Sequence, residues 1–157
     1  MTEIPVWDVE GLYPGFDSPA WTRDKNALSG TSKRLVRHLK LLAQAQDTAE
    51  RYQVLAGLLQ LFDKGSALAE HLTSFAYLLF STNTQDERAL KELNEVEKIT
   101  LSLRDAQVRF RSLWGKSGLT PNGFVKAQPN LAAYRLLLEE AGLMARHQLS
   151  VGEEALA

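Results

Sequence analysis

Histidine spacing is the first test for metal chemistry, because two histidines four positions apart on a helix, with a glutamate between them, bind zinc and activate a bound water. The chain has three histidines, His38, His71 and His147, and they lie far apart in the sequence. Only His71 has an acidic neighbour, Glu70. Lone histidines in helices are usually surface or hydrogen-bonded residues. We therefore predict no catalytic residue, no metal ligand and no cofactor-binding residue in this chain.

Other catalytic patterns are also missing from the sequence. It has no cysteine, which excludes a disulfide framework, a thiolate zinc site and a cysteine nucleophile. No strand is predicted ahead of a glycine-rich loop, and no Gly-x-Ser-x-Gly sequence occurs. Nucleotide binding and serine hydrolysis therefore have no support.

Two basic segments could bind an anion. The denser one contains Lys33, Arg34, Arg37, His38 and Lys40, several of which share one helical face that could meet phosphate or an acidic peptide. The more common interpretation of such a run is a solvated face. The formal net charge of -1 gives the chain no overall attraction to nucleic acid, so we predict no nucleic-acid partner.

The second basic set lies close in sequence to two large aromatic residues. The cations are Arg104, Arg109, Arg111 and Lys116, and the aromatic residues are Phe110 and Trp114. Together they could form a lip that contacts a peptide. The alternative is ordinary solvation of the charges, with the aromatic rings packed in the core.

The composition is that of an ordinary folded protein. With 157 residues, of which 45% are hydrophobic and 24% charged, the chain fits a single domain with one core. The start of the sequence has neither the basic segment nor the apolar segment of a secretory signal. The longest strongly apolar run, Phe75 to Phe80, is too short to span a bilayer. We predict a cytoplasmic location and no membrane partner.

Helix signals predict an all-α fold, an antiparallel bundle of about five helices with an extended N-terminal arm. The bundle is expected over residues 18–149. Ser18 is a candidate N-cap for the first helix, over residues 19–44, because Pro19 follows it at the first helical position. Gly30 weakens the middle of that helix, where we expect a kink or break.

The next two helices are predicted on either side of a glycine. Asp47 or Thr48 can cap a second helix that ends at Gly65, and a third follows from Ser66. The run from Phe75 to Phe80 is apolar on all sides, which favours burial between neighbours. The third helix is therefore the candidate central helix.

The fourth helix is predicted to begin at a capping box formed by Thr84 and Glu87, and to run for about 28 residues. Its apolar stripe consists of Ala89, Leu93, Val96, Leu103, Ala106, Phe110 and Leu113. Residues 114–130 are rich in glycine and proline, so we expect a loop with at most a short helical turn. Asn130 can cap a last helix over residues 131–141, which Gly142 closes.

The two ends of the chain carry separate signals. Residues 1–17 are predicted to form the extended arm, in which Trp7, Tyr13 and Phe16 either cover a groove, contact another domain or pack on the chain's own helices. Residues 150–157 begin with a capping box, Ser150 to Glu153. So short a helix is marginal by itself, so we expect that more protein follows.

Three separated segments together resemble the N-terminal domain of oligoendopeptidase F and related thimet-oligopeptidase-like zinc metallopeptidases. Trp7-Asp8 with Leu12-Tyr13-Pro14 resembles the opening Trp-Asp-Leu…Leu-Tyr-Pro arm of that family. Phe80 to Asp86 is similar to its Tyr-Ser-Thr-Asp-Thr turn. The third segment resembles the family's passage Tyr-Arg…Leu-Ser-x-x-Glu-Glu…Leu-Ala. Its matching residues are Tyr134-Arg135, Leu149-Ser150, Glu153-Glu154 and Leu156-Ala157. The segments occur in the family's order, with departures at Val9, Gly11, Asn83 and Gly152.

The resemblance implies a function in peptide hydrolysis. In that family an N-terminal helical domain forms one wall of a deep channel, and a C-terminal domain carries zinc on a His-Glu-x-x-His helix with a later glutamate. By resemblance this chain is the channel-forming lobe, truncated before the catalytic domain and inactive alone. Its partners would be the catalytic domain of the same polypeptide and short peptide substrates, and zinc is expected only in the parent enzyme. Such a fragment is expected to expose apolar surface and to form a homodimer.

Two other functions stay open on the sequence. A free-standing helical bundle could bind a protein partner, or itself, through the stripe of the fourth helix. The expected continuation beyond Ser150 speaks against that alternative. The third hypothesis, nucleic-acid binding through the face from Lys33 to Lys40, is weakened by the near-zero net charge.

Overall fold

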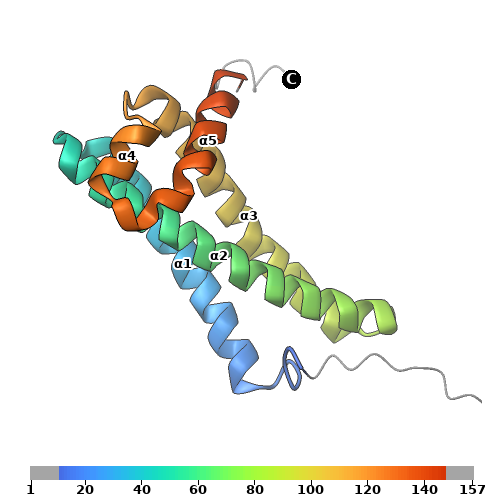
Figure 1. The fold of residues 1–157 in the computed structure, drawn as a ribbon. Helices are drawn as coiled ribbons and strands as arrows, with labels where there is room; N and C mark the ends of the chain where they lie inside the picture. The colour runs from blue at the N-terminus through green and yellow to red at the C-terminus, as the bar shows by residue number, and fades with distance from the viewer. Residues whose placement is uncertain (1–10, 148–157) are drawn as a thin grey trace, which may run out of the picture. The chain divides into compact units, whose positions relative to one another are not determined.

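The structure, a computed structural model, describes residues 11–147. Its α-helices are α1 (Pro19–Gln44), α2 (Thr48–Thr82), α3 (Glu87–Lys116), α4 (Pro121–Ala127) and α5 (Arg135–His147), and a 3₁₀-helix, η1, spans Pro129–Tyr134 (Figure 1). No β-strand occurs among residues 11–147, so the predicted all-α bundle is confirmed. The predictions for Trp7 and for the helix start at Ser150 lie outside the described residues.

The chain divides into two compact units, each made from two stretches of sequence. Unit 1 contains the described part of residues 1–33 together with residues 63–103. Unit 2 contains residues 34–62 together with the described part of residues 104–157. Each unit has its own buried side chains, and the predicted single domain stays a prediction.

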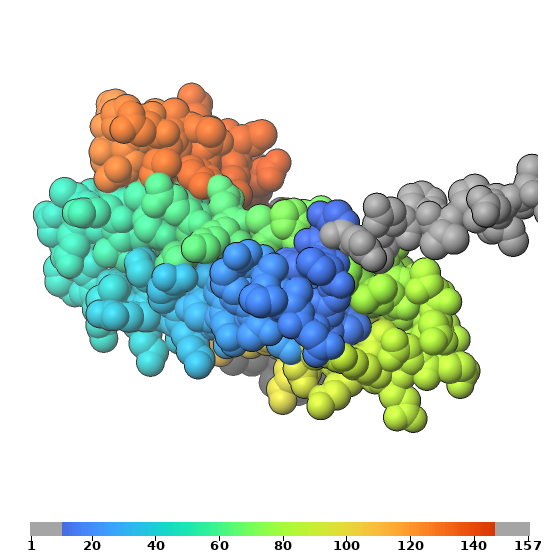
Figure 2. Space-filling view, turned by 90° about the horizontal axis from the view of Figure 1, so that it is seen from below, coloured from blue at the N-terminus to red at the C-terminus, as the bar shows by residue number. Residues whose placement is uncertain are grey.

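An aromatic cluster forms the core at one end of unit 1. The ring centroid of Trp21 lies 5.3 Å from that of Tyr13, 5.0 Å from that of Phe16 and 5.4 Å from that of Phe75. Most of these pairs meet edge to face, a geometry that aromatic rings prefer. In Figure 2 the start of α1, in blue, lies directly against the second half of α2. Tyr13 and Phe16 of the predicted arm thus pack on the chain's own helices.

Helix α1 begins where the sequence indicates but does not break. The Ser18 hydroxyl accepts a hydrogen bond from the backbone N–H of Trp21, which confirms the predicted N-cap. The predicted kink or break near Gly30 is wrong, because α1 is continuous from Pro19 to Gln44. Glycine costs a helix only about 1 kcal/mol relative to alanine, and the burial of Leu28 and Thr31 on either side outweighs that cost.

Helix α2 joins two helices that were predicted to be separate. Asp47 caps it by accepting a hydrogen bond from the N–H of Glu50. Gly65 does not end a helix but lies inside α2, where an added Cβ would be 3.0 Å from the Leu103 side chain. Its small size therefore serves close packing. The run Phe75 to Phe80 is also less buried than predicted, because Tyr77 is 59% exposed.

Helix α3 has the predicted stripe but a different cap. Asp86 accepts hydrogen bonds from the N–H groups of Arg88 and Ala89, so it is the N-cap, and α3 begins at Glu87. The predicted capping box of Thr84 and Glu87 is therefore wrong. Asp86 lies directly before the first turn of α3, so its carboxylate satisfies the free N–H groups that the capping box was predicted to satisfy. The predicted stripe residues Ala89, Leu93, Val96, Leu103, Ala106 and Phe110 are buried.

The C-terminal part of unit 2 is more helical than predicted. The stretch predicted as a loop contains the two-turn helix α4, which Thr120 caps and which buries Phe124. The predicted helix over residues 131–141 is replaced by η1 and by α5, which runs on through Gly142. A Cβ at Gly142 would lie 3.4 Å from the Trp114 indole nitrogen, which is an ordinary contact distance.

Candidate functional site

An open groove of about 1440 Å³ lies within unit 2. It is lined by the end of α1, the last turns of α3, the start of α4 and the second half of α5. Figure 1 shows α5, in red, beside the C-terminal end of α3. The volume exceeds the range of roughly 300 to 1,000 Å³ that is usual for small-molecule sites. A groove of this size suits an extended ligand such as a peptide.

The floor of the groove is apolar and held in place by specific contacts. Leu39, Trp114 and Leu138 line it and are almost fully buried. The Trp114 indole N–H donates a hydrogen bond of 2.9 Å to the carbonyl oxygen of Leu138, which fixes α5 against α3. At Gly115 an added Cβ would lie only 2.6 Å from the Cβ of Ala145, so the two helices touch closely there. The floor is therefore preformed.

The margins of the groove combine exposed apolar and cationic side chains. Val36, Val108 and Leu143 line it and are 37%, 41% and 57% exposed. Four exposed cations line it as well, and these are Lys40, Arg109, Lys116 and Arg146. Among the described residues, none of the four forms an ion pair. The groove thus offers unpaired positive charge above an apolar floor.

Two acidic residues also line the groove. Glu139 already pairs with Arg135, whose Nε lies 2.9 Å from its Oε1. Asp105 is exposed and forms no ion pair with another described residue. Because one of the two carboxylates is neutralised locally, the groove carries an excess of positive charge.

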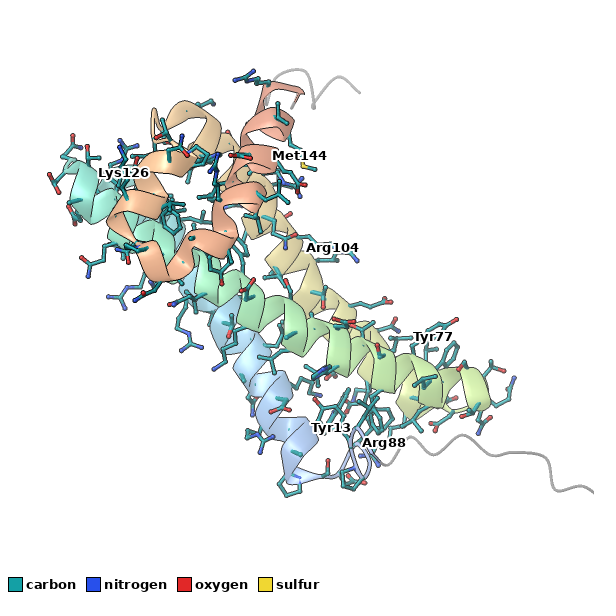
Figure 3. All side chains as sticks on the ribbon, in the orientation of Figure 1. Tyr13, Tyr77, Arg88, Arg104, Lys126 and Met144 are labelled. Carbon is teal, nitrogen blue, oxygen red and sulfur yellow. The ribbon has the colours of Figure 1, made fainter. Side chains whose placement is uncertain are left out.

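The second basic set from the sequence is only partly assembled in this groove. Arg109 and Lys116 line it, but Arg104 and Arg111 do not. Figure 3 shows the Arg104 side chain extending from α3 away from the helix. Phe110 is buried beneath Trp114, with ring centroids 6.5 Å apart. The groove therefore has two of the four cations of this set, and the two aromatic residues are buried.

The first basic run is mostly a solvated face, as the alternative interpretation held. Lys33, Arg34 and Arg37 are exposed, and only Lys40 of the run lines the groove. His38 is half-buried, with its Nδ1 3.0 Å from the carbonyl oxygen of Arg34. A local backbone contact thus accounts for this histidine.

The part of the chain that the structure describes has neither a metal-binding cluster nor a membrane-spanning helix. Within residues 11–147 no group of three or more histidine, cysteine, aspartate or glutamate side chains could hold a metal ion. His71 is exposed on α2. None of the helices that the structure describes is both long enough and apolar enough to cross a membrane.

Unit 1 has its own charged cluster, and its members satisfy one another. The Lys25 ammonium lies 2.6 Å from Glu92 and 2.9 Å from Glu95, and the Trp21 indole N–H donates to Glu92. Burial alone would lower the pKa of Lys25, but its hydrogen bonds to Glu92 and Glu95 outweigh burial and raise that pKa. The hydrogen bond from Lys25 lowers the pKa of Glu95. A closed network of this kind stabilises structure and leaves no group free for a ligand.

Tyr13, Asp24 and Arg23 form a second hydrogen-bonded group in unit 1. Burial and the hydrogen bond that its hydroxyl donates to Asp24 raise the pKa of Tyr13 to about 12. Hydrogen bonding from Arg23 in turn lowers the pKa of Asp24, despite an opposing effect of burial. The phenol is therefore held neutral and serves as a structural donor.

The turn between α2 and α3 is also explained by local hydrogen bonds. The hydroxyls of Ser81 and Thr82 donate to carbonyl oxygens of the preceding helical turn, and the side chain of Asn83 accepts from the N–H of Gln85. Together with the cap at Asp86, these bonds use the side chains of Ser81, Thr82, Asn83 and Asp86. Local structure therefore accounts for these side chains.

Several groove residues were missed by sequence reasoning. Arg146 and Leu138 lie on α5 and were given no role, and Lys40 was assigned to a different surface. No local sequence signal links these positions, because their proximity depends on how α1, α3 and α5 pack within unit 2. No family model, curated protein or solved structure matches the chain.

Proposed function

We propose that this chain is the helical, substrate-channel-forming lobe of a zinc-dependent oligoendopeptidase that hydrolyses short peptides. The single observation that carries the proposal is the groove of unit 2, with a volume of about 1440 Å³, which combines an apolar floor with cations that form no ion pair with another described residue. Peptides are recognised in such grooves by apolar side-chain pockets and by charged groups at the margins. In the whole enzyme the groove would form part of the wall that contacts substrate.

The motif order of the sequence supports the same proposal. Tyr13 of the first segment is buried and its hydroxyl is hydrogen-bonded, which explains a tyrosine at that position. In the turn segment, Asp86 caps α3. Arg135 of the third segment pairs with Glu139 on α5. The described parts of the resembling segments thus have structural roles, which is compatible with a lobe that positions substrate.

The chemistry of the proposed enzyme would be peptide-bond hydrolysis by a zinc-activated water in a separate catalytic domain. The contribution of this chain would be to enclose the peptide and to orient it. We expect the chain by itself to hydrolyse no peptide, with or without added zinc, in a quenched-fluorescence peptide assay.

The test begins with the coding sequence downstream of Ala157. A His-Glu-x-x-His motif in the same reading frame is expected, and the protein so encoded should cleave short quenched-fluorescence peptides with dependence on zinc. Replacing the glutamate of that motif by glutamine is the matched control and should abolish cleavage. A reading frame without the motif, or a zinc-loaded product without peptidase activity, would contradict the proposal.

One observation favours a second candidate function, a helical module that binds a protein partner or itself. Leu136, Leu143 and Met144 on α5 are 64%, 57% and 52% exposed, and they fall on one helical face. Figure 3 shows Met144 extending away from α5. If this face mediates self-association, light scattering should detect a dimer that the double substitution Leu136→Lys and Met144→Lys converts to a monomer. A wild-type monomer at high concentration would contradict self-association.

A further inference from the structure

We propose that the groove of unit 2 selects acidic peptides, with carboxylate side chains on its cations and apolar side chains on the exposed apolar residues of its margin. This inference rests on the proposed function and names the substrate class of the same site. The proposed ligand is a substrate peptide that carries acidic residues, glutamate or aspartate, together with apolar residues.

Charge complementarity is the main argument. Lys40 comes from α1, Arg109 and Lys116 from α3, and Arg146 from α5, so three helices direct cations to one groove. Against these four charges the groove has only Asp105 as an unpaired carboxylate among the described residues, because Glu139 is paired with Arg135. The chain as a whole has a formal charge of -1, so this excess is local. Local excess charge of one sign favours a ligand of the opposite sign.

Exposed apolar side chains restrict the ligand further. Val36, Val108 and Leu143 line the groove beside the cations and are 37%, 41% and 57% exposed, so a ligand in the groove meets apolar surface as well as charge. A small polyanion would leave that surface exposed to water. A peptide that alternates acidic and apolar side chains covers it and meets the cations as well.

Nucleic acid is a poorer fit to the same groove. Single-stranded nucleic acid is usually held by exposed aromatic rings on which bases stack. Trp114 is the aromatic residue in the groove lining, and only 4% of it is exposed.

The experiment uses the whole chain and three fluorescent probe peptides that differ only in charge. Each peptide has leucine and alanine at fixed positions, and the intervening positions are all glutamate, all glutamine or all lysine. Fluorescence anisotropy gives each Kd in low salt and in physiological salt. We expect the glutamate peptide to bind at least about tenfold more tightly than the glutamine peptide, and we expect salt to reduce that difference.

Matched variants connect binding to the groove. The double substitution Arg109→Glu and Lys116→Glu should weaken binding of the glutamate peptide by about tenfold or more, and should improve binding of the lysine peptide. Arg104→Glu is the control, because Arg104 is an exposed cation on the same helix outside the groove. It should leave both affinities unchanged. If circular dichroism shows that the double variant is unfolded, Lys40→Glu on α1 replaces it, with the same expected direction.

The outcomes separate this inference from the proposed function. Equal Kd values for the three peptides, or an unchanged Kd in the groove variants, would overturn acidic selectivity while leaving the peptidase proposal intact. Binding of single-stranded DNA that competes with the glutamate peptide would also overturn it, because the site would then recognise phosphate. A downstream sequence without His-Glu-x-x-His would remove the peptidase and leave the measured selectivity as a property of a binding module.

Discussion

The two tryptophans that the structure describes have the same burial but different surroundings. Trp21 in unit 1 is 1% exposed, is contacted by three aromatic rings, and donates its indole N–H to the carboxylate of Glu92. Trp114 in unit 2 is 4% exposed, donates to a backbone carbonyl on α5, and lines the groove. The first tryptophan fills a closed core, and the second supports one wall of an open surface.

The charges of the two units differ in the same way. In unit 1, Lys25 is held between Glu92 and Glu95, so its charge is neutralised within the fold. In unit 2, Arg109 and Lys116 line the groove without an ion-pair partner among the described residues. Paired charges stabilise a structure, whereas unpaired charges beside an apolar groove are available to a ligand. Of the two units, unit 2 therefore has the charges that a ligand could pair with.

The largest expected effect comes from removing the Trp21 ring. Trp21→Ala should reduce the free energy of unfolding by about 3 to 5 kcal/mol, because a large aromatic side chain is lost from a closed core. Trp114→Ala should cost less, because the space left by its ring would open onto the groove and could be filled by water. Urea denaturation followed by circular dichroism measures both changes. A larger loss for Trp114→Ala would contradict the distinction between a closed and an open environment.

The second prediction concerns close contact between helices. Gly115→Ala places a methyl group 2.6 Å from the Cβ of Ala145, so it should destabilise the protein by about 1 to 3 kcal/mol and alter the groove. Gly30→Ala is the matched control, since nothing lies within 4 Å of its added Cβ and it also lies inside a helix. That substitution should stabilise by about 0.5 to 1 kcal/mol. Thermal unfolding of both variants checks the opposite signs.

The third prediction distinguishes two ways of starting α3. Asp86→Ala should cost about 1 kcal/mol, because the carboxylate of Asp86 accepts hydrogen bonds from two free N–H groups of the first turn. Thr84→Ala should change the free energy of unfolding much less. Urea midpoints of the two variants provide the measurement. A larger loss at Thr84 would restore the capping box that the sequence predicts.

Part of the fold could be predicted from the sequence. The start of α1 at Ser18 and the apolar stripe of α3 depend on local spacing, and both were predicted. Gly65 and Gly142 were taken for helix ends because glycine commonly follows a helix. Both lie inside helices. A Cβ at Gly65 would come within 3.0 Å of the Leu103 side chain, which is distant in sequence, whereas a Cβ at Gly142 would make only an ordinary contact with Trp114.

The groove was harder to predict than the helices. Its cations lie on α1, α3 and α5, and only Arg109 and Lys116 belong to one predicted set. Their convergence depends on the packing of unit 2, which has no local signature. Trp114 was predicted near these cations, but its hydrogen bond to Leu138, which fixes the floor, follows only from the position of α5.

The smallest expected effect concerns the paired charges of unit 1. The pKa of Glu95 is lowered by the hydrogen bond from Lys25, so the folded state keeps this carboxylate ionised at a pH at which the unfolded chain binds a proton. Its stabilising contribution is therefore complete above the unfolded pKa of about 4.5 and is lost as the pH falls through the lower folded pKa. The Glu95 side chain is 46% exposed, so water screens the pair and the contribution at neutral pH should stay below about 1 kcal/mol.

Glu95→Gln should accordingly lower the urea midpoint slightly at neutral pH and make the midpoint less sensitive to acid. Glu97→Gln is the matched control, because Glu97 is exposed on the same helix and forms no ion pair among the described residues. It should change neither quantity. An equal acid dependence in wild type and Glu95→Gln would mean that the pair with Lys25 does not persist in solution. Unit 1 would then also contain a loosely held cation, which would weaken its contrast with the groove of unit 2.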